Sequence, residues 1–241
     1  MARWQHWLAA AGLLLAAVPA LAATLRVVVD DSTEMPLAEL RDGHLLQGWH
    51  KDVGELLAAR LQREAVFVIR PRNRLPVELN AGGADIVCGY QPQWLPGPFA
   101  WSIAVAEHHD VLITPLSEPR PRNLAAVGGK MIGTVLGFHY PELEAALGHR
   151  FLRDDAPRAE ANLDKLVAGR IRHVVINSQY LDYQIKRGRF KLALHPRLPL
   201  SQGWVRCALS PASTVRLTEL NRAIRGAQRD GSLAAISRRY R

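Results

Sequence analysis

The feature of this sequence that most constrains its fold is an alternation of strand-like and helix-like segments that stops and then starts again. Residues 25–29 and 65–69 are β-branched and predict strands, and residues 52–63 between them carry apolar side chains at helical spacing. A short helix is predicted over residues 75–81 and a third strand over residues 85–88. Strands that alternate with helices pair in parallel through right-handed crossovers, so this half predicts an α/β unit.

The alternation restarts near residue 109, and a proline-bearing connection over residues 115–123 precedes its helices. Further strands are predicted over residues 109–114, 131–135, 150–153, 173–176, 190–194 and 204–209. Further helices are predicted over residues 141–147, 159–168 and 179–186, and in a C-terminal tail that Gly231 interrupts. A second connection is expected at Pro196 and Pro199. The pattern therefore predicts two α/β units joined by two connections, the second of which returns the chain to the first unit.

The first 22 residues have the features of a signal peptide. Arg3 is followed by an apolar run from Leu8 to Val18 and by the small residues of Pro19–Ala22, which suit a cleavage site. The run is shorter than the ~20 residues that a membrane span needs. An ordinary N-terminal helix is the alternative interpretation. We expect residues 1–22 to be removed, the mature chain to start near Ala23, and the protein to be periplasmic.

The formal net charge of +9 makes a nucleic-acid partner worth considering. The export signal argues against it, and a basic exported protein can simply be solvated or attracted to anionic envelope surfaces. We therefore expect no nucleic-acid partner.

The chain has two cysteines, Cys88 and Cys207. An oxidising compartment permits a disulfide between them, provided that their Cα atoms lie within about 7 Å. Each also ends or interrupts a strand-like run, so both can instead be small buried apolar residues. The sequence leaves these two alternatives open.

Several segments together resemble a known family. The segments are Leu25-Arg-Val-Val-Val-Asp30 with Met35-Pro36-Leu37, Gly48-Trp-His-Lys-Asp52-Val53, Leu79-Asn-Ala-Gly-Gly-Ala-Asp85-Ile-Val, Gly129-Lys-Met-Ile-Gly133-Thr-Val-Leu-Gly137, Leu166-Val-Ala-Gly169-Arg170-Ile, and Leu220-Asn-Arg-Ala-Ile with Asp230-Gly231-Ser-Leu and Ile236 to Tyr240. In this order they resemble the family 3 periplasmic solute-binding proteins, the polar amino-acid-binding type of ABC importers. The resemblance covers essentially the whole mature chain.

The resemblance implies a two-lobe periplasmic binding protein fold of type II, with two parallel-type sheets joined by a two-strand hinge. Residues 24–113 and 202–241 are expected to form the first lobe and residues 116–198 the second, with the hinge near residues 112–116 and 198–203. It also implies that the lobes close over a small-molecule ligand in the cleft and that the protein serves an ABC permease. We expect a monomer.

The residues that grip an α-amino acid in this family are absent at the matching positions. The family's carboxylate-binding arginine would fall within Leu95 to Gly97, but no arginine occurs between Cys88 and Trp101. The family's ammonium-binding aspartate corresponds to Asn177, and the aspartate that precedes it corresponds to Arg172. A buried charge without a partner costs several kcal/mol. We therefore expect a ligand other than a standard free α-amino acid, or other groups that replace the clamp.

Aromatic and cationic residues are the remaining candidates for ligand binding. The predicted ligand-binding residues are Trp94, Tyr90, Arg72, Phe138, His139, Tyr140, Asn177 and Glu34. Arg74 accompanies Arg72 near the start of the first-lobe helix. The alternatives are a solvated surface for the two arginines and simple packing for Trp94, Phe138 and Tyr140. As a binding set they predict a cleft that is more aromatic and more cationic than usual, suited to an anionic or aromatic organic ligand.

Other chemistry finds little support in the sequence. The pair His108-His109 precedes Asp110, but neighbours on a strand point to opposite faces and would not chelate one metal ion. The phosphate-binding, nucleophile-elbow and zincin motifs do not occur. We expect no catalytic residue, no metal and no cofactor, and a binding protein for an ABC-type importer. The first alternative is a sensor or accessory protein of the same fold that presents its closed state to a membrane receptor or an oxidoreductase partner. The second is an enzyme on the same scaffold, since a few dehydratases resemble this family, with Glu34 as its acid.

Overall fold

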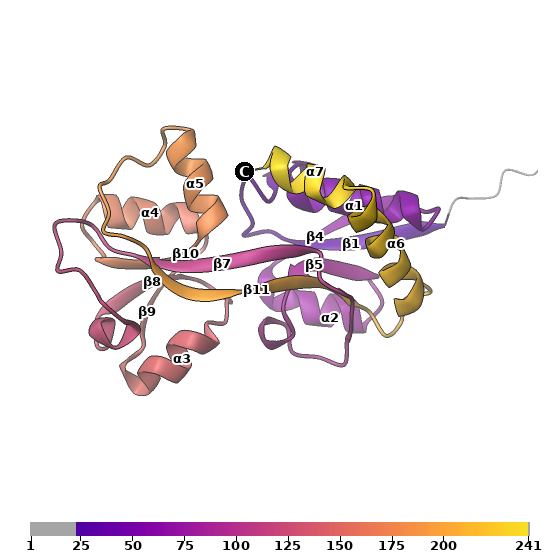
Figure 1. Ribbon diagram of the computed structural model, residues 1–241. Coiled ribbons are helices and arrows are strands. Elements are labelled where there is room, and N and C mark those ends of the chain that lie inside the picture. Colours follow the sequence, from indigo (N-terminus) through magenta and orange to yellow (C-terminus); the bar gives the residue numbers. More distant parts are fainter. Residues whose placement is uncertain (1–22, 241) are drawn as a thin grey trace, which may run out of the picture.

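The computed structural model describes residues 23–240, and the predicted signal peptide, residues 1–22, lies outside this range. Two lobes lie side by side, and two long strands, β7 and β11, run between them (Figure 1). In each lobe helices lie on both faces of a sheet, as expected for strands that alternate with helices.

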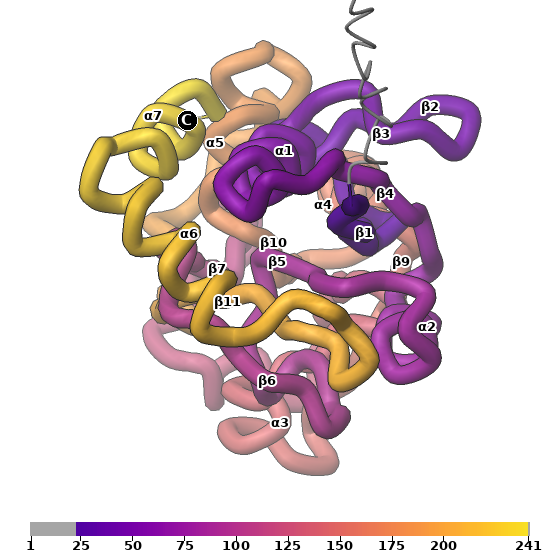
Figure 2. The backbone as a smooth tube through the Cα atoms, turned by 90° about the vertical axis from the view of Figure 1, so that its right-hand side faces the viewer, coloured from indigo at the N-terminus to yellow at the C-terminus, as the bar shows by residue number. Residues whose placement is uncertain are grey.

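The first lobe contains the sheet β4-β1-β5-β11, in that order. Its strands are β1 (Thr24–Asp30), β4 (Glu64–Arg70), β5 (Ile86–Tyr90), the short β6 (Ala100–Trp101) and part of β11 (Leu198–Leu209). Its helices are α1 (Trp49–Arg60), α2 (Leu75–Asn80), α6 (Leu217–Arg229) and α7 (Ser232–Arg239), with single 3₁₀ turns η1 (Arg72–Arg74) and η2 (Pro92–Trp94). β1 pairs in parallel with β4 and β5, and β11 pairs antiparallel with β5. Figure 2 shows α1, α6 and α7 gathered on the side of the sheet away from α2.

The second lobe contains the sheet β7-β10-β8-β9. Its strands are β7 (Ala106–Ile113), β8 (Met131–Val135), β9 (Leu152–Ala156) and β10 (His173–Asn177). Its helices are α3 (Pro141–Leu147), α4 (Ala159–Val167) and α5 (Ser178–Lys186), with 3₁₀ turns η3 (Leu124–Val127) and η4 (Gly148–Arg150). β8 pairs in parallel with β9 and β10, as the repeated alternation predicts.

The two connecting strands pair antiparallel along their length, from Leu198 opposite Leu112 to Val205 opposite Ala106. Residues 110–113 of β7 also pair with β10, so they already belong to the second-lobe sheet. On this register we propose that the chain crosses between the lobes within residues 106–110 and 199–205. The first of these crossings lies earlier than the predicted hinge near residues 112–116. The boundaries of the lobes otherwise stay a prediction.

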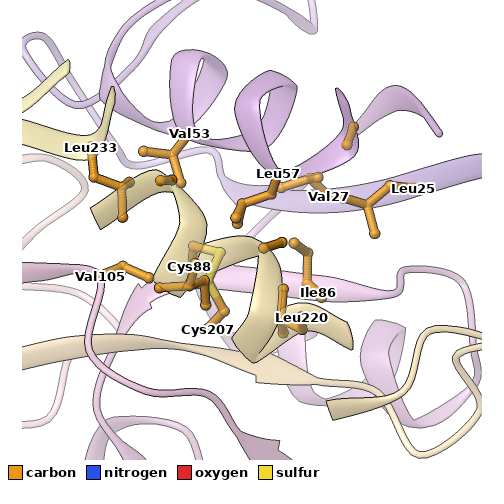
Figure 3. Packing of buried hydrophobic residues seen from close by; sticks show 14 of the residues in the cluster. Leu25, Val27, Val53, Leu57, Ile86, Cys88, Val105, Cys207, Leu220 and Leu233 are labelled. Atoms are coloured by element: carbon orange, nitrogen blue, oxygen red, sulfur yellow. A yellow bond between two sulfur atoms is a disulfide. The ribbon is translucent and has the colours of Figure 1, made fainter. Parts of the chain in front are cut away.

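The core of each lobe follows from side-chain alternation along its strands. In the first lobe Val27 packs beneath α1 while its neighbour Val28 packs against α2 on the opposite face. Cys88 of β5 and Cys207 of β11 lie directly opposite each other across the strand pair, and they form a disulfide with a Cα separation of 3.9 Å. Figure 3 shows this disulfide surrounded by apolar side chains of the strands and of α1, α6 and α7. The cross-link therefore lies inside the first-lobe core.

Two sequence predictions differ from the structure, and one further element was not predicted. Residues 190–194 form no strand, and only Leu194 makes an isolated bridge, to Pro115. Pro199 lies inside β11 rather than in a connection. At this point β11 pairs with β7 alone and is an edge strand, where a proline is tolerated. The hairpin of β2 (Glu39–Arg41) and β3 (His44–Gln47) was not predicted, since its strands are only three and four residues long.

Candidate ligand-binding site

A cavity of about 140 Å³ lies between the two lobes. All eight residues that the sequence predicts for ligand binding line it, whereas Arg74 is exposed outside it. These eight residues are Glu34, Arg72, Tyr90, Trp94, Phe138, His139, Tyr140 and Asn177. The structure thus brings the whole predicted set to one place, and its role in binding stays a prediction.

The carboxyl ends of the parallel strands explain why these residues meet. In the first lobe β1, β4 and β5 all end at this cavity, so the segments that follow them carry Glu34, Arg72 and Trp94 to it. In the second lobe the segment after β8 supplies Phe138, and β10 ends at Asn177. Ligands of open α/β sheets bind in crevices outside the carboxyl ends of strands. Here two such crevices face each other.

Arg72 bridges the two lobes. Its guanidinium lies 4.4 Å from the ring centroid of Tyr90 in the first lobe and 4.2 Å from that of Phe138 in the second. Its Nη1 lies 3.5 Å from Oδ2 of Asp30, whose side chain is 2% exposed. The alternative of a solvated Arg72 is therefore wrong, since only 10% of its side chain is exposed. Because Asp30 offsets the guanidinium charge, the cavity is less cationic than the sequence indicates.

Trp94 satisfies both interpretations that the sequence offers for it. Its ring lies edge-on to the imidazole of His108, with centroids 4.7 Å apart and an interplanar angle of 67°. It is buried and belongs to the first-lobe core, and it also lines the cavity. An aromatic wall held in this way has a fixed orientation toward a ligand.

A polar cluster of His108, Asp110 and Asn177 lines the second-lobe side of the cavity. Asp110 of β7 lies directly opposite Asn177 of β10 in the strand pairing. The Asn177 Nδ2 lies within hydrogen-bond distance, 3.3 Å, of Nδ1 of His108, and the other ring nitrogen, Nε2, is directed toward Asp110. That Nε2 lies 2.9 Å from Oδ1 of Asp110 but is not aligned for a hydrogen bond. As strand alternation predicts, His109 instead lies beside Glu107, away from the cavity.

Glu34 makes a second contact between the lobes. Its Oε2 accepts a hydrogen bond of 3.1 Å from the backbone N–H of Glu160, in the first turn of α4. Burial raises the pKa of Glu34, and the bond from Glu160 partly opposes that rise. A third contact joins Gln179 Nε2 to the carbonyl oxygen of Tyr240 at 3.0 Å.

The remaining predicted residues differ in how far their polar groups are engaged. The hydroxyl of Tyr140 accepts the backbone N–H of Val135 at 3.0 Å, so packing and local bonding explain this residue. His139 is exposed at the rim. Asn177 caps α5, because its Oδ1 accepts the backbone N–H of Tyr180 at 3.0 Å.

The comparison with solved structures decides the fold. An ancestral arginine-binding protein bound to arginine superimposes with a TM-score of 0.74 and 17% identity, over 90% of this chain and 98% of that one. The chain has the two-lobe periplasmic binding protein fold. An amino acid ABC transporter substrate-binding protein from Streptococcus pneumoniae, bound to L-arginine, gives a TM-score of 0.70 and 14% identity over 89% of this chain and 92% of that one.

An ancestral amino acid-binding protein described as a precursor of cyclohexadienyl dehydratase is similar at a TM-score of 0.73 and 15% identity, over 90% of this chain and 95% of that one. These neighbours are mostly binding proteins for amino acids, which is the class that the sequence motifs resemble. Neither a protein-family model nor a curated protein sequence matches the chain.

Some residues that line the cavity were not identified from the sequence. His50, Tyr180 and Asp110 line the cavity but were not predicted to bind. Burial, with a smaller effect of Arg72, lowers the pKa of His50 to about 4, so its ring is neutral at neutral pH. Tyr180 is buried near Glu34, and burial raises the pKa of its hydroxyl. The i, i+2 spacing of His108 and Asp110 was the available signal, since it places both side chains on one face of a strand.

Every helix within residues 23–240 is too short or too polar to cross a membrane. In the same range the structure has no group of three or more His, Cys, Asp or Glu side chains that could hold a metal ion.

Proposed function

We propose that this protein is a periplasmic solute-binding protein that captures a small organic ligand between its lobes and serves an ABC-type importer. The observation that carries the proposal is the cavity itself, which both lobes line with the segments that follow their parallel strands. Its walls combine several aromatic rings with a few polar groups, the composition typical of small-molecule sites.

The mechanism that we propose is closure about the strands β7 and β11. A ligand in this cavity touches both lobes only when they are together, so binding shifts the population toward the closed form. The contacts Glu34–Glu160, Arg72–Phe138 and Gln179–Tyr240 belong to this closed arrangement. They lower the free energy of closure that the ligand has to supply.

The same contacts support the second candidate function, a sensor or accessory protein. A closed form that the chain's own residues stabilise is a suitable signal for a membrane receptor, whatever the ligand's onward fate. Genes for a permease and an ATPase beside the gene for this protein would favour the importer, and a gene for a membrane receptor there would favour the sensor.

The test of solute binding is a thermal-shift screen of residues 23–241 with L-amino acids, amines, carboxylates and neutral aromatic solutes. A ligand at 100 times its Kd stabilises the protein by about 2.7 kcal/mol. Small-angle scattering of a hit should show a smaller radius of gyration than that of the protein alone. If no solute stabilises the protein and none changes its dimensions, the proposed function is wrong.

Two neighbouring residues provide a matched pair of variants for any hit. Phe138 lines the cavity and contacts Arg72, whereas Leu136, in the same loop, is 63% exposed and does not line it. Phe138→Ala should weaken binding at least about tenfold, as the loss of a central aromatic contact does. Leu136→Ala should leave the affinity unchanged. Turnover of the hit during the screen would instead favour the dehydratase-like alternative.

A further inference from the structure

We propose that the cavity selects a small organic cation, a protonated amine that carries no carboxylate, and that Asp110 is the residue that holds its positive charge. This inference rests on the proposed function, because it names the ligand class of the same cavity. It replaces the expectation of an anionic ligand.

The first argument is the position of Asp110. In the strand pairing Asp110 stands directly opposite Asn177, so a carboxylate adjoins the position where the resemblance places an ammonium-binding aspartate. Asn177 itself is engaged at both ends of its amide, by His108 and by the backbone N–H of Tyr180. The acceptor for a cation at this end of the cavity is therefore on β7 and not on β10.

The second argument is the remaining capacity of Asp110. A carboxylate offers about four acceptor positions. Asp110 accepts one hydrogen bond, of 3.3 Å, from the Ser201 hydroxyl, and its other oxygen faces the unaligned Nε2 of His108. Within residues 23–240 Asp110 makes no ion pair with a lysine or arginine. Its charge is largely sheltered from solvent, with 17% of the side chain exposed, so a ligand ammonium would gain a strong partner there.

The third argument is the lack of a free partner for a ligand carboxylate. Among the described residues that line the cavity, Arg72 is the only one with a permanent positive charge. Its guanidinium is enclosed by Tyr90 and Phe138 and faces Asp30. An anionic or zwitterionic ligand would have to displace this arrangement or bury an uncompensated carboxylate. Asp110 adds a carboxylate to this lining, so the balance of charges in the cavity favours a cation.

The fourth argument concerns the body of the ligand. The rings of Trp94, Tyr140 and Tyr180 line the cavity together with Val135 and Ile176. Aromatic faces attract organic cations, and these apolar walls suit a hydrocarbon body. An apolar cavity of about 150 Å³ holds benzene. The cavity of about 140 Å³ therefore suits an amine with a ring or chain of that size.

The experiment compares four probes that share one ring and differ in charge, namely benzylamine, benzyl alcohol, benzoate and L-phenylglycine. Thermal shift and calorimetry on residues 23–241 should show binding of benzylamine at millimolar concentration or below, and at least about tenfold weaker binding of the other three. Benzoate or L-phenylglycine binding more tightly than benzylamine would overturn the inference and leave the proposed function standing. A failure of benzylamine and of the other amines of the solute screen would also overturn it, whether or not a non-amine solute binds.

Two variants test the role of Asp110. Asp110→Asn keeps the shape of the side chain and should weaken benzylamine binding at least about tenfold. Glu107→Gln removes a solvent-exposed charge from the same strand at a residue that does not itself line this cavity, and should change the affinity less than about twofold. Unfolding curves establish that both variants are folded. Equal benzylamine affinities for wild type and Asp110→Asn would overturn the assignment of Asp110.

Discussion

Reduction of the disulfide between Cys88 and Cys207 should strongly destabilise the protein. The two cysteines are 119 residues apart in sequence and lie in the first-lobe core, 3% and 0% exposed. Cross-linking residues this far apart removes chain entropy from the unfolded state, by about 5 kcal/mol in the loop-closure model. Measured values are commonly 2–5 kcal/mol, so we expect the free energy of unfolding to fall by about that amount.

The assay is urea unfolding of oxidised and fully reduced wild-type protein, followed by far-ultraviolet circular dichroism. With a urea m-value of about 2–3 kcal/mol/M, the midpoint should fall by about 1–2 M on reduction. A thiol titration must find no free thiol in the oxidised sample and both in the reduced one. The variant Cys88→Ala/Cys207→Ala controls for the reductant, because its midpoint should not respond to it. Equal midpoints for oxidised and reduced wild type would refute the reasoning that this bond constrains the unfolded chain.

Three further predictions concern single residues. Burial lowers the pKa of His173 from 6.5 to about 4. Below about pH 6.5 this histidine is therefore protonated in the unfolded chain but still neutral in the folded protein. The contribution of His173 to stability is therefore complete above that pH and falls by about 2 kcal/mol by about pH 5, and His50, whose pKa is also lowered to about 4, adds a similar loss. Urea unfolding at both pH values should show a smaller loss for His173→Gln than for the wild type, and an equal loss would contradict the prediction. Gly133→Ala would place a Cβ 2.6 Å from Ile171 Cδ1 and 2.9 Å from Asn162 Oδ1, and we expect a loss of about 1–3 kcal/mol; an unchanged melting temperature would show that the site relaxes. Asn177→Ala removes the N-cap of α5 and should cost about 1 kcal/mol in urea unfolding, whereas Asn177→Ser, which can cap the helix without placing a second carboxylate opposite Asp110, should restore most of it.

Local sequence patterns were sufficient to predict most of the fold. Val27 and Val28 illustrate the reason, since a strand buried on both faces has to be apolar at every position and this is visible in sequence. The strand predicted over residues 190–194 failed because Phe190 and Leu192 are apolar for another reason, namely packing of a loop against the second-lobe core. Pro199 was misassigned because the sequence does not say that its strand has only one neighbour there.

Most residues of the candidate site could be predicted from the sequence, but the balance of charges in the cavity could not. Motif positions brought Arg72, Trp94 and Phe138 to one cavity, because the segments that follow parallel strands share an edge. The pairing of Arg72 with Asp30, and of Asp110 with Asn177, depends on which strands are neighbours. Asp110 and Asn177 are 67 residues apart in sequence, and no periodicity connects them. The sign of the cavity's charge is therefore a property of the tertiary structure.

Because the chain passes from the first lobe to the second and back, the two lobes can complete their folding only in a certain order. The second-lobe strands β8 to β10 and their helices follow one another in sequence, so that lobe can complete its core as soon as the first residues of β11 have been synthesised. The first lobe cannot complete its core at that stage. Its strand β5 pairs with the C-terminal end of β11, and its helix α1 packs against α6 and α7, which are the last elements of the chain. Until they arrive, β5 presents an unpaired apolar edge and Cys88 has no partner. A chain that lacks its last helix, α7, would leave part of the buried face of α1 exposed, so a truncation at the C-terminus should destabilise the N-terminal part of the first lobe.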